Sequence, residues 1–368
     1  MGERKSAVES LGMNSACWRD RKVFLTGHTG FKGGWLALWL QHLGARVSGF
    51  ALAPPTTPSV FELAQVQRGM VSTIGDIRNR SALEAALRAS EAEVVFHLAA
   101  QPLVRRSYAQ PFETYETNVL GTVRLLEAVR ATPSVRAVVV VTSDKCYDNK
   151  EWAWGYRENE PLGGFDPYSS SKACAELVTA AYRSSFFQAA TAGAPVALAS
   201  ARAGNVIGGG DWAEDRLLPD ILRAFAAARP VRIRNPRARR PWQHVLEPLS
   251  GYLQLAAALL ADGPAHARAW NFGPGDEADR TVQWIVQRAA ELWGDDARWE
   301  LDSGGQPHEA EQLRLDSTCA RSQLHWSPRW NLEQALERVV DWHRAQRAGR
   351  NMREFTLAQI EEYSRWTR

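Results

Sequence analysis

The chain has 368 residues, of which 45% are hydrophobic and 23% are charged, so it has enough apolar material for a folded core and no compositional sign of disorder. Lysine and arginine total 44 against 41 aspartate and glutamate, and this even balance gives no general reason to expect nucleic acid or an anionic membrane as a partner. The length fits two domains, or one large α/β domain with a smaller lobe.

The sequence shows no signal for secretion, membrane insertion or metal binding. Residues 1–20 mix charges of both signs without an apolar stretch, and we expect them to form a loose arm. The longest run of consecutive valines, leucines or isoleucines, Val138–Val141, is far shorter than the roughly 20 residues of a membrane-spanning helix. The four cysteines are scattered without a CxxC pair, which fits neither a disulfide framework nor a zinc site. We therefore expect a cytoplasmic protein that holds no metal and binds neither nucleic acid nor a membrane.

From Lys22 the chain alternates short β-rich runs with longer amphipathic stretches, a pattern typical of a doubly wound parallel sheet. The expected strands are 22–26, 45–52, 70–74, 93–99, 136–142 and 195–202. The expected helices are 31–43, 81–89, 112–131, 169–187, 331–348 and 354–368. After Asn205 the alternation weakens and long polar loops follow.

These elements predict an α/β protein of the Rossmann type with a smaller, mixed C-terminal lobe that binds the substrate. The expected division is an arm at 1–20, a dinucleotide-binding domain at 21–204 plus about 241–275, and a lobe at 205–240 plus 276–368.

A glycine-rich turn follows the first expected strand and opens a helix. Glycines at three-residue spacing let the backbone approach a pyrophosphate, whose charge is favoured by the free amides and dipole at a helix N-terminus. Lys32 is either a cation beside the phosphates or a solvated residue at a helix start, and His28 is expected to point at the phosphates without a catalytic role. The residues assigned to dinucleotide binding are Gly27, His28, Thr29, Gly30, Phe31, Lys32 and Gly33.

The end of the second strand does not decide between NAD and NADP. Dinucleotide sites usually place an acidic residue about 20 positions beyond the glycine turn. Here residues 50–52 are Phe-Ala-Leu, and neither an acid nor an arginine stands at this strand end. Asp76 contacts the adenine or caps the helix that begins near Asn79. The same nucleotide site is expected to include Ile77, Leu98, Ala99 and Ala100.

A second group of polar residues lies at the end of the fifth strand and at the start of a helix. Tyr168 and Lys172 are four positions apart, hence one turn apart on one helix face. A nearby lysine and an oxidised nicotinamide favour the phenolate of a tyrosine, whose pKa is ordinarily near 10. Residues 142–145, Thr-Ser-Asp-Lys, end the fifth strand, where parallel sheets present their chemistry. We expect them to meet Tyr168 over the nicotinamide.

Eight motifs together resemble those of the extended short-chain dehydrogenase/reductases that act on nucleotide sugars. They are TGHTGFKGGWL, HLAAQPLVRRSY, TNVLGT, TSDKCYDN, ENEPLGGFDPYSSSKACAELV, ARAGNVIGGGDWAEDRLLPD, RPWQHVLEPLSGYL and WNFGP, and the resemblance runs from about Lys22 to about Trp342. Residues 143–145, Ser-Asp-Lys, are similar to the CDP-glucose branch of the 4,6-dehydratases, whereas the dTDP-glucose branch carries Thr-Asp-Glu. The resemblance implies NAD as the cofactor. It also implies a homodimer or a dimer of dimers built on the helices at 112–131 and 169–187.

The resemblance further implies an internal redox cycle on the sugar. Tyr168, supported by Lys172, takes the proton of the 4-hydroxyl while the C4 hydride passes to NAD. Asp144 is the acid at the C6 hydroxyl, water leaves across C5 and C6, and the hydride returns to C6. Lys145 replaces a glutamate base, so it is either a neutral amine that removes the C5 proton or a cation that stabilises the enolate. The product would be a CDP-4-keto-6-deoxyglucose.

The residues expected to hold the substrate come from several loops. Ser143 and Thr142 would hydrogen-bond the sugar 4-oxygen. The one strong local charge cluster, arginines 232, 234, 237, 239 and 240, suits a pyrophosphate better than nucleic acid, given the even net charge. His308 either closes over the sugar or ribose or is simply solvated, and Arg234 is the weaker choice among the arginines. The resemblance implies that Asn205 and Arg240 bind the diphosphate and that Arg216 and Leu217 begin the helix over the nucleotide. The full expected substrate set is Gln101, Ser143, Asn205, Arg216, Leu217, Arg234, Arg240 and His308.

Two alternatives stay open. A 4-epimerase or a 4,6-dehydratase for a UDP-, dTDP- or GDP-sugar shares the fold, but an epimerase has no need of the Asp144–Lys145 pair. A non-enzymatic NAD-sensing protein could dispense with Tyr168 and Lys172, both of which the chain retains.

Overall fold

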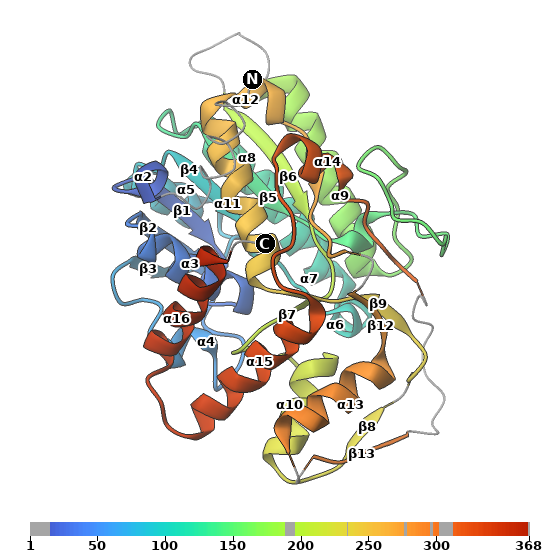
Figure 1. Cartoon of the computed structure of the whole chain (residues 1–368). Coiled ribbons are helices and arrows are strands. Elements are labelled where there is room, and N and C mark those ends of the chain that lie inside the picture. The colour runs from blue at the N-terminus through green and yellow to red at the C-terminus, as the bar shows by residue number, and fades with distance from the viewer. Residues whose placement is uncertain are drawn as a thin grey trace.

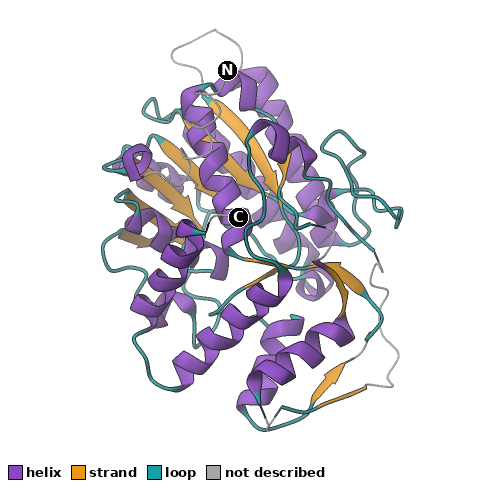
Figure 2. Cartoon of the chain, viewed as in Figure 1, coloured by secondary structure: helices purple, strands orange, loops and turns teal. Residues whose placement is uncertain are grey.

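The computed structural model describes residues 15–187, 196–233, 235–275, 278–294, 297–301 and 312–366. Its centre is a seven-stranded parallel sheet in the order β11-β6-β5-β4-β1-β2-β3, with helices on both faces (Figure 1 and Figure 2). The strands are β1 (Lys22–Thr26), β2 (Arg46–Ala51), β3 (Val71–Ile74), β4 (Val94–His97), β5 (Ala137–Val141), β6 (Ala197–Arg202) and β11 (Ala269–Asn271). All six strands expected from the sequence belong to this sheet, which confirms the doubly wound α/β fold.

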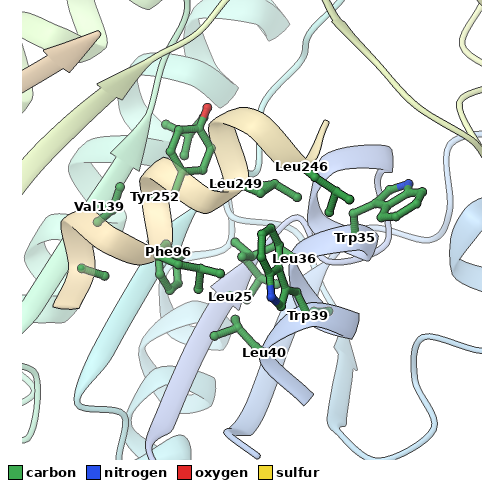
Figure 3. Packing of buried hydrophobic residues seen from close by; sticks show 14 of the residues in the cluster. Leu25, Trp35, Leu36, Trp39, Leu40, Phe96, Val139, Leu246, Leu249 and Tyr252 are labelled. Atoms are coloured by element: carbon green, nitrogen blue, oxygen red, sulfur yellow. The ribbon is translucent and has the colours of Figure 1, made fainter. Parts of the chain in front are cut away.

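Helices cover both faces of the sheet and bury alternate strand residues in two cores. The helices α3 (Phe31–His42) and α11 (Leu246–Ala261) pack on one face, against Leu25, Phe96 and Val139 (Figure 3). The other face packs against α5 (Arg80–Ser90), α8 (Gly121–Arg130) and the end of α9 (Pro167–Tyr182). Because both faces are covered, the central strands are continuous apolar runs, as in the Ala-Val-Val-Val-Val of β5.

The two long helices expected from the sequence each contain a π-helical segment. The first consists of α7 (Pro111–Tyr115), the π-helix η1 (Glu116–Leu120) and α8. The second, α9, continues into the π-helix η3 (Arg183–Phe187). Such local widening of a helix is frequent at functional sites.

Both ends of the described chain pack against the sheet domain, the first on a strand and the second on a helix. Helix α2 (Ser15–Trp18) buries Trp18 beside Phe96, with ring centroids 6.1 Å apart, so the described end of the expected arm is packed rather than loose, and residues 1–14 lie outside the described part. The two expected C-terminal helices are α15 (Leu332–Arg347) and α16 (Met352–Arg365), and α16 packs against α3. The expected domain boundaries stay a prediction.

A smaller lobe follows β6, and it has its own apolar core, which includes Ile221, Phe225, Ile285 and Val339. The stretches expected there as loops contain short paired strands. These are β7 (Val206–Ile207) with β10 (Gln243–His244), β8 (Val231–Ile233) with β13 (Trp299–Leu301), and β9 (Arg239–Pro241) with β12 (Asp279–Thr281). The remaining elements are α4 (Val60–Leu63), α6 (Val104–Ala109), the 3-10 helix η2 (Asp144–Cys146), α10 (Leu217–Ala226), α12 (Gly263–His266), α13 (Val282–Trp293) and α14 (Thr318–Gln323).

A buried ion pair joins α9 to the sheet. Arg202 and Glu176 lie 2.8 Å apart, and each side chain is only 3% exposed. Glu176 also accepts hydrogen bonds from the hydroxyls of Thr142, at 2.5 Å, and Ser200, at 2.7 Å. The pair therefore fastens α9 to the ends of β5 and β6.

We predict that Arg202→Leu lowers the free energy of unfolding by about 3–5 kcal/mol, because it leaves the Glu176 carboxylate buried without a counter-ion. The measurement is urea-induced unfolding. The double variant Glu176→Leu/Arg202→Leu is the control and should lose less, since no buried charge is then left unpaired. An equal loss in both variants would contradict the electrostatic explanation.

Candidate active site

The glycine turn after β1 forms an open cradle for an anion. Gly27 has a φ of +79°, and a Cβ there would lie 2.8 Å from the Ala99 nitrogen, so β4 and the turn approach closely. A Cβ on Gly33 would lie 2.0 Å from the Gly27 oxygen. Gly30 begins α3 without a side-chain cap, which leaves the amides of the first turn open. This arrangement fits a dinucleotide pyrophosphate.

Neighbouring residues of the turn fix its position. The Thr29 hydroxyl donates to the Leu52 oxygen at 2.8 Å, and the Thr26 hydroxyl accepts from the amides of Leu98 and Ala99, each at 3.2 Å. The residues after β4 and the glycine turn are therefore held side by side, as a shared nucleotide site requires.

His28 does not point at the site of the phosphates. Its ring is fully buried, with Nε2 2.7 Å from the Ser72 hydroxyl and the ring edge-on to Phe61. The space exists because residue 49 is a glycine, where a Cβ would lie 2.4 Å from the imidazole. Burial lowers the pKa of His28 to about 4. The orientation expected from the sequence is wrong.

Lys32 belongs to the electrostatic surroundings of the catalytic residues. Burial lowers its pKa to about 7, the cations Arg216 and Lys172 add to this effect, and Asp144 and Asp211 oppose it. The Lys32 side chain is half-buried rather than free in solvent at the helix start. Its contact with a phosphate stays a prediction.

Asp76 does not cap a helix. Its Oδ2 accepts from two guanidinium nitrogens of Arg78, at 2.8 and 2.6 Å, and the Arg78 hydrogen bond holds the pKa of Asp76 below its usual value. The N-cap of α5 is Asn79, which accepts from the Ala82 amide. The capping alternative is wrong, and contact with the adenine stays a prediction. Ile77 is buried in the core beneath this segment.

The structure brings Ser143, Asp144 and Tyr168 together. Ser143 caps η2 by accepting from the Lys145 amide at 3.2 Å, donates to Oδ1 of Asp144 at 2.9 Å and hydrogen-bonds the Tyr168 phenol. Asp144 is buried, and its Oδ2 has no partner among the described residues. A Cβ on Gly204 would lie 2.0 Å from that oxygen, so glycine is required where β6 ends.

Tyr168 and Lys172 lie one turn apart in α9, and Arg216 is a further cation that acts on the phenol. Burial raises the pKa of Tyr168 to about 12, the Ser143 hydrogen bond works against this, Asp144 adds to it, and Arg216 lowers it. Lys172 donates to the Val141 oxygen at 3.3 Å, and burial lowers its pKa to about 8. The shared helix predicted from the spacing is confirmed, and the support of the Tyr168 phenolate by Lys172 stays a prediction.

Two predicted site residues already have partners within the protein. The Thr142 hydroxyl donates to Glu176, so its proton is committed to the buried ion pair rather than to a sugar oxygen. The Gln101 amide donates to the Thr114 hydroxyl and the Leu103 oxygen, and it accepts from the Leu103 amide, which shapes the loop between β4 and α6. Lys145 is half-buried and makes no ion pair in the described part of the chain.

The expected substrate residues approach from the lobe side. Asn205 has a φ of +29°, and its amide nitrogen is buried with no partner among the described residues. Arg216 stands at the start of α10, before Leu217, and donates to Asp211 at 2.8 Å. Arg240 lies on β9 and donates to the carbonyl of its neighbour. Arg234 and His308 lie outside the described residues.

Asn118 is a site-supporting residue that the sequence reasoning missed. It lies in the π-helix η1. Its side-chain oxygen accepts from the backbone amide of Gln101 at 2.8 Å, and its side-chain nitrogen donates to the Ser171 hydroxyl at 2.8 Å. It thereby links the loop after β4 to α9. The available signal was an asparagine on the helix face that also carries Thr114 and Thr122, because a buried asparagine is normally hydrogen-bonded.

The described residues contain no group of three or more His, Cys, Asp or Glu side chains that could hold a metal ion. All four cysteines are free. In the same part of the chain no helix is long and apolar enough to cross a membrane.

Comparison with known proteins confirms the resemblance. A curated CDP-glucose 4,6-dehydratase of Salmonella typhimurium is 56% identical over 347 residues, covering 94% of this chain and 97% of its own. The structure of MoeE5 in complex with UDP-glucose and NAD matches with a TM-score of 0.73 and 27% identity over 88% of this chain and 99% of its own. The dTDP-glucose 4,6-dehydratase DesIV of Streptomyces venezuelae, 22% identical with a TM-score of 0.74 over 89% and 98% of the two chains, shares the fold. The family model for GDP-mannose 4,6 dehydratase matches residues 24–339, and the chain therefore belongs to this family of extended short-chain dehydrogenase/reductases.

Proposed function

We propose that the chain is an NAD-dependent CDP-glucose 4,6-dehydratase, which converts CDP-glucose to CDP-4-keto-6-deoxyglucose and water. The observation that carries this proposal is the buried Asp144 carboxyl beside Tyr168, with one oxygen bound to Ser143 and the other unpartnered. An epimerase needs the tyrosine but has no step for this acid. The 56% identity to a CDP-glucose dehydratase over nearly the whole chain supports the choice of nucleotide.

The glycine turn fits NAD as the resident cofactor. Gly27 and Gly33 leave no room for side chains, and the first turn of α3 presents uncapped amides to a pyrophosphate. The residues that would hold the cofactor are the turn 27–33, the segment after β4, and Tyr168 and Lys172 at the nicotinamide end. When bound, NAD accepts the hydride from C4 and returns it to C6.

The protein's residues supply the proton transfers. Tyr168 removes the proton of the 4-hydroxyl, and the Ser143 hydrogen bond and Arg216 favour its phenolate against the effect of burial. The 4-ketone then acidifies the C5 proton. Asp144 gives its proton to the departing C6 oxygen, which leaves as water while the C5–H electrons form the C5–C6 double bond. Lys145, on the same 3-10 turn, is the residue proposed to act at C5. As a neutral amine it would take the C5 proton, and as a cation it would stabilise the enolate while water takes that proton.

The substrate diphosphate would bind between the sheet and the lobe. The unpartnered amide of Asn205, the Arg216 guanidinium and the Arg240 guanidinium are the donors proposed for it. Arg216 would then serve both the diphosphate and the electrostatics of Tyr168.

The proposal is tested by incubating the purified protein with NAD and, separately, with CDP-, UDP-, dTDP- and GDP-glucose. The alkaline absorbance of a 4-keto sugar reports dehydration. We expect product from CDP-glucose and little from the other three sugars. If only another nucleotide sugar gave product, the proposed preference for CDP-glucose would be wrong. An epimerised product without 4-keto sugar would show that the proposed reaction, dehydration, is wrong.

Lys145→Met should still oxidise C4 but fail in elimination, because the half-buried lysine is the group beside Asp144 that is available to act at C5. Reduced cofactor and CDP-4-keto-glucose should accumulate, as followed by absorbance and mass spectrometry. In D₂O the unmodified protein should place solvent deuterium at C5 of the product.

Lys145→Arg is the matched control, because arginine keeps the positive charge but cannot act as a base at neutral pH. Retained elimination in Lys145→Arg would assign Lys145 as a cation that stabilises the enolate, and lost elimination would assign it as the base. Unchanged dehydration in Lys145→Met would show that the residue has no role.

A homodimer is the proposed assembly, with a dimer of dimers as the larger form. Helix α9 contacts α7, η1 and η3. The surface that these four elements form exposes large apolar side chains. They are Phe112 (80% exposed), Leu120 (48%), Leu177 (58%) and Phe186 (46%). Such a patch fits an interface between two copies of the chain. The cytoplasmic location expected from the cysteines stays a prediction.

The double variant Leu120→Arg/Leu177→Arg should be monomeric, because four guanidiniums would then lie in the apolar centre of a twofold interface. Light scattering at micromolar concentration should give about 41.0 kDa for the variant and a multiple of this for the unmodified protein. Leu301→Arg, at a residue 64% exposed on β13 in the lobe, is the control and should keep the assembly. A monomeric unmodified protein would contradict the proposal.

A further inference from the structure

Tyr252 on α11 is a buried tyrosine that has no role in the proposed reaction as described above. The residue is completely buried, and its hydroxyl has no hydrogen-bond partner in the described part of the chain. Buried tyrosine hydroxyls normally have a partner. We therefore expect a hydrogen-bond acceptor near the Tyr252 hydroxyl.

The surroundings of Tyr252 place it beneath the catalytic end of the sheet. Its ring packs edge-on against Phe272, with centroids 5.7 Å apart and planes at 76°. Phe272 directly follows β11 at the carboxyl edge of the parallel sheet, the edge where Thr142 and Gly204 follow β5 and β6. Figure 3 shows the Tyr252 hydroxyl pointing out of the surrounding apolar cluster, away from Leu249.

Asp144 supplies the complementary atom. Its Oδ1 accepts from Ser143, while Oδ2 is buried, unpartnered and packed against Gly204. Burial raises the pKa of Tyr252 far above its usual value, and the nearby Tyr168 and Asp144 raise it further. The phenol therefore stays a protonated donor at neutral pH.

We propose that Tyr252 is a positioning residue for the acid of the elimination step, whose hydroxyl donates to Oδ2 of Asp144 through one buried water. This inference rests on the proposed dehydratase function. Asp144 transfers its proton to the C6 oxygen as the C6–O bond breaks, and the carboxylate left behind shares its charge between both oxygens. Ser143 then meets one oxygen with a donor, and Tyr252 meets the other through the water.

The alternative, that Tyr252 acts on Tyr168, is less favoured by the contacts. The Tyr168 phenol already has Ser143 as a partner, whereas Oδ2 of Asp144 has none among the described residues. The two possibilities differ in the step they affect, because Tyr168 serves C4 oxidation and Asp144 serves elimination.

The test is Tyr252→Phe, which removes one oxygen and keeps the packed ring. In single turnovers of CDP-glucose with NAD, C4 oxidation and the KM should change by less than about twofold, while elimination slows about fivefold to tenfold. CDP-4-keto-glucose and reduced cofactor should accumulate transiently. Thermal stability should not fall, because the hydroxyl removed has no partner in the described structure.

Two controls separate this role from a loosening of the core. Tyr363→Phe removes another fully buried phenol of the same cluster, one that donates to Glu247 at 2.6 Å, and it should leave the ratio of oxidation to elimination unchanged. In an Asp144→Asn background, Tyr252→Phe should have no further effect on elimination if it acts through Asp144.

Each remaining outcome decides between the claims. Unchanged elimination in Tyr252→Phe, with the unmodified protein active on CDP-glucose, would overturn this inference alone. So would a slowed C4 oxidation with normal elimination, which would place Tyr252 beside Tyr168 instead. Absence of any 4-keto sugar from the unmodified protein would overturn the proposed function and this inference with it.

Discussion

The buried ion pair between Glu176 and Arg202 is the constraint on which the arrangement of the site depends. Arg202 reaches beyond Glu176 to the hydroxyl of Tyr147, at 2.7 Å, which in turn donates to Asn271 of β11 at 2.8 Å. Burial raises the pKa of Glu176, but Arg202 and the hydrogen bonds to the carboxylate outweigh this effect and the pKa falls below its usual value. The carboxylate therefore stays charged, and it opposes the effect of burial on the ammonium of Lys172, one turn earlier in α9. One interaction thus fixes both where α9 lies on the sheet and how readily its lysine holds a proton.

Glycines permit the close approaches that this arrangement requires. Gly204 lets the Asp144 carboxyl lie against the end of β6, and Gly27 and Gly33 let the first turn of α3 close on β1 and β4. Side chains at these positions would displace the acid or fill the cradle proposed for the cofactor. The carboxyl ends of β1, β4, β5 and β6 therefore lie close together, and the candidate site residues follow these strands in short loops and turns.

Much of the fold was readable from the sequence, because strands buried on both faces are continuous apolar runs with clear boundaries. The helix α11 was not recognised, since nearly all of its residues are buried and it lacks the polar face that gives helices their periodicity. The strand β11 was also missed, because three residues carry too little pattern for any assignment. The orientation of His28 depends on a glycine in a neighbouring strand, which adjacent residues in the sequence do not reveal. The local sequence pattern thus predicts helices and strands well, but it predicts poorly the side-chain orientations that depend on tertiary packing.

The same distinction governs the candidate site, because the sequence indicated which residues come together but not their proton affinities. The spacing of Tyr168 and Lys172 places both on one helix face, and burial then disfavours charge on each of them. Their actual balance is set by groups far apart in the chain. Ser143 and Arg216 favour the phenolate, and Glu176 favours the ammonium. The strength of the base is therefore a property of the folded protein, created only when the end of β5, α9 and the segment before α10 come together.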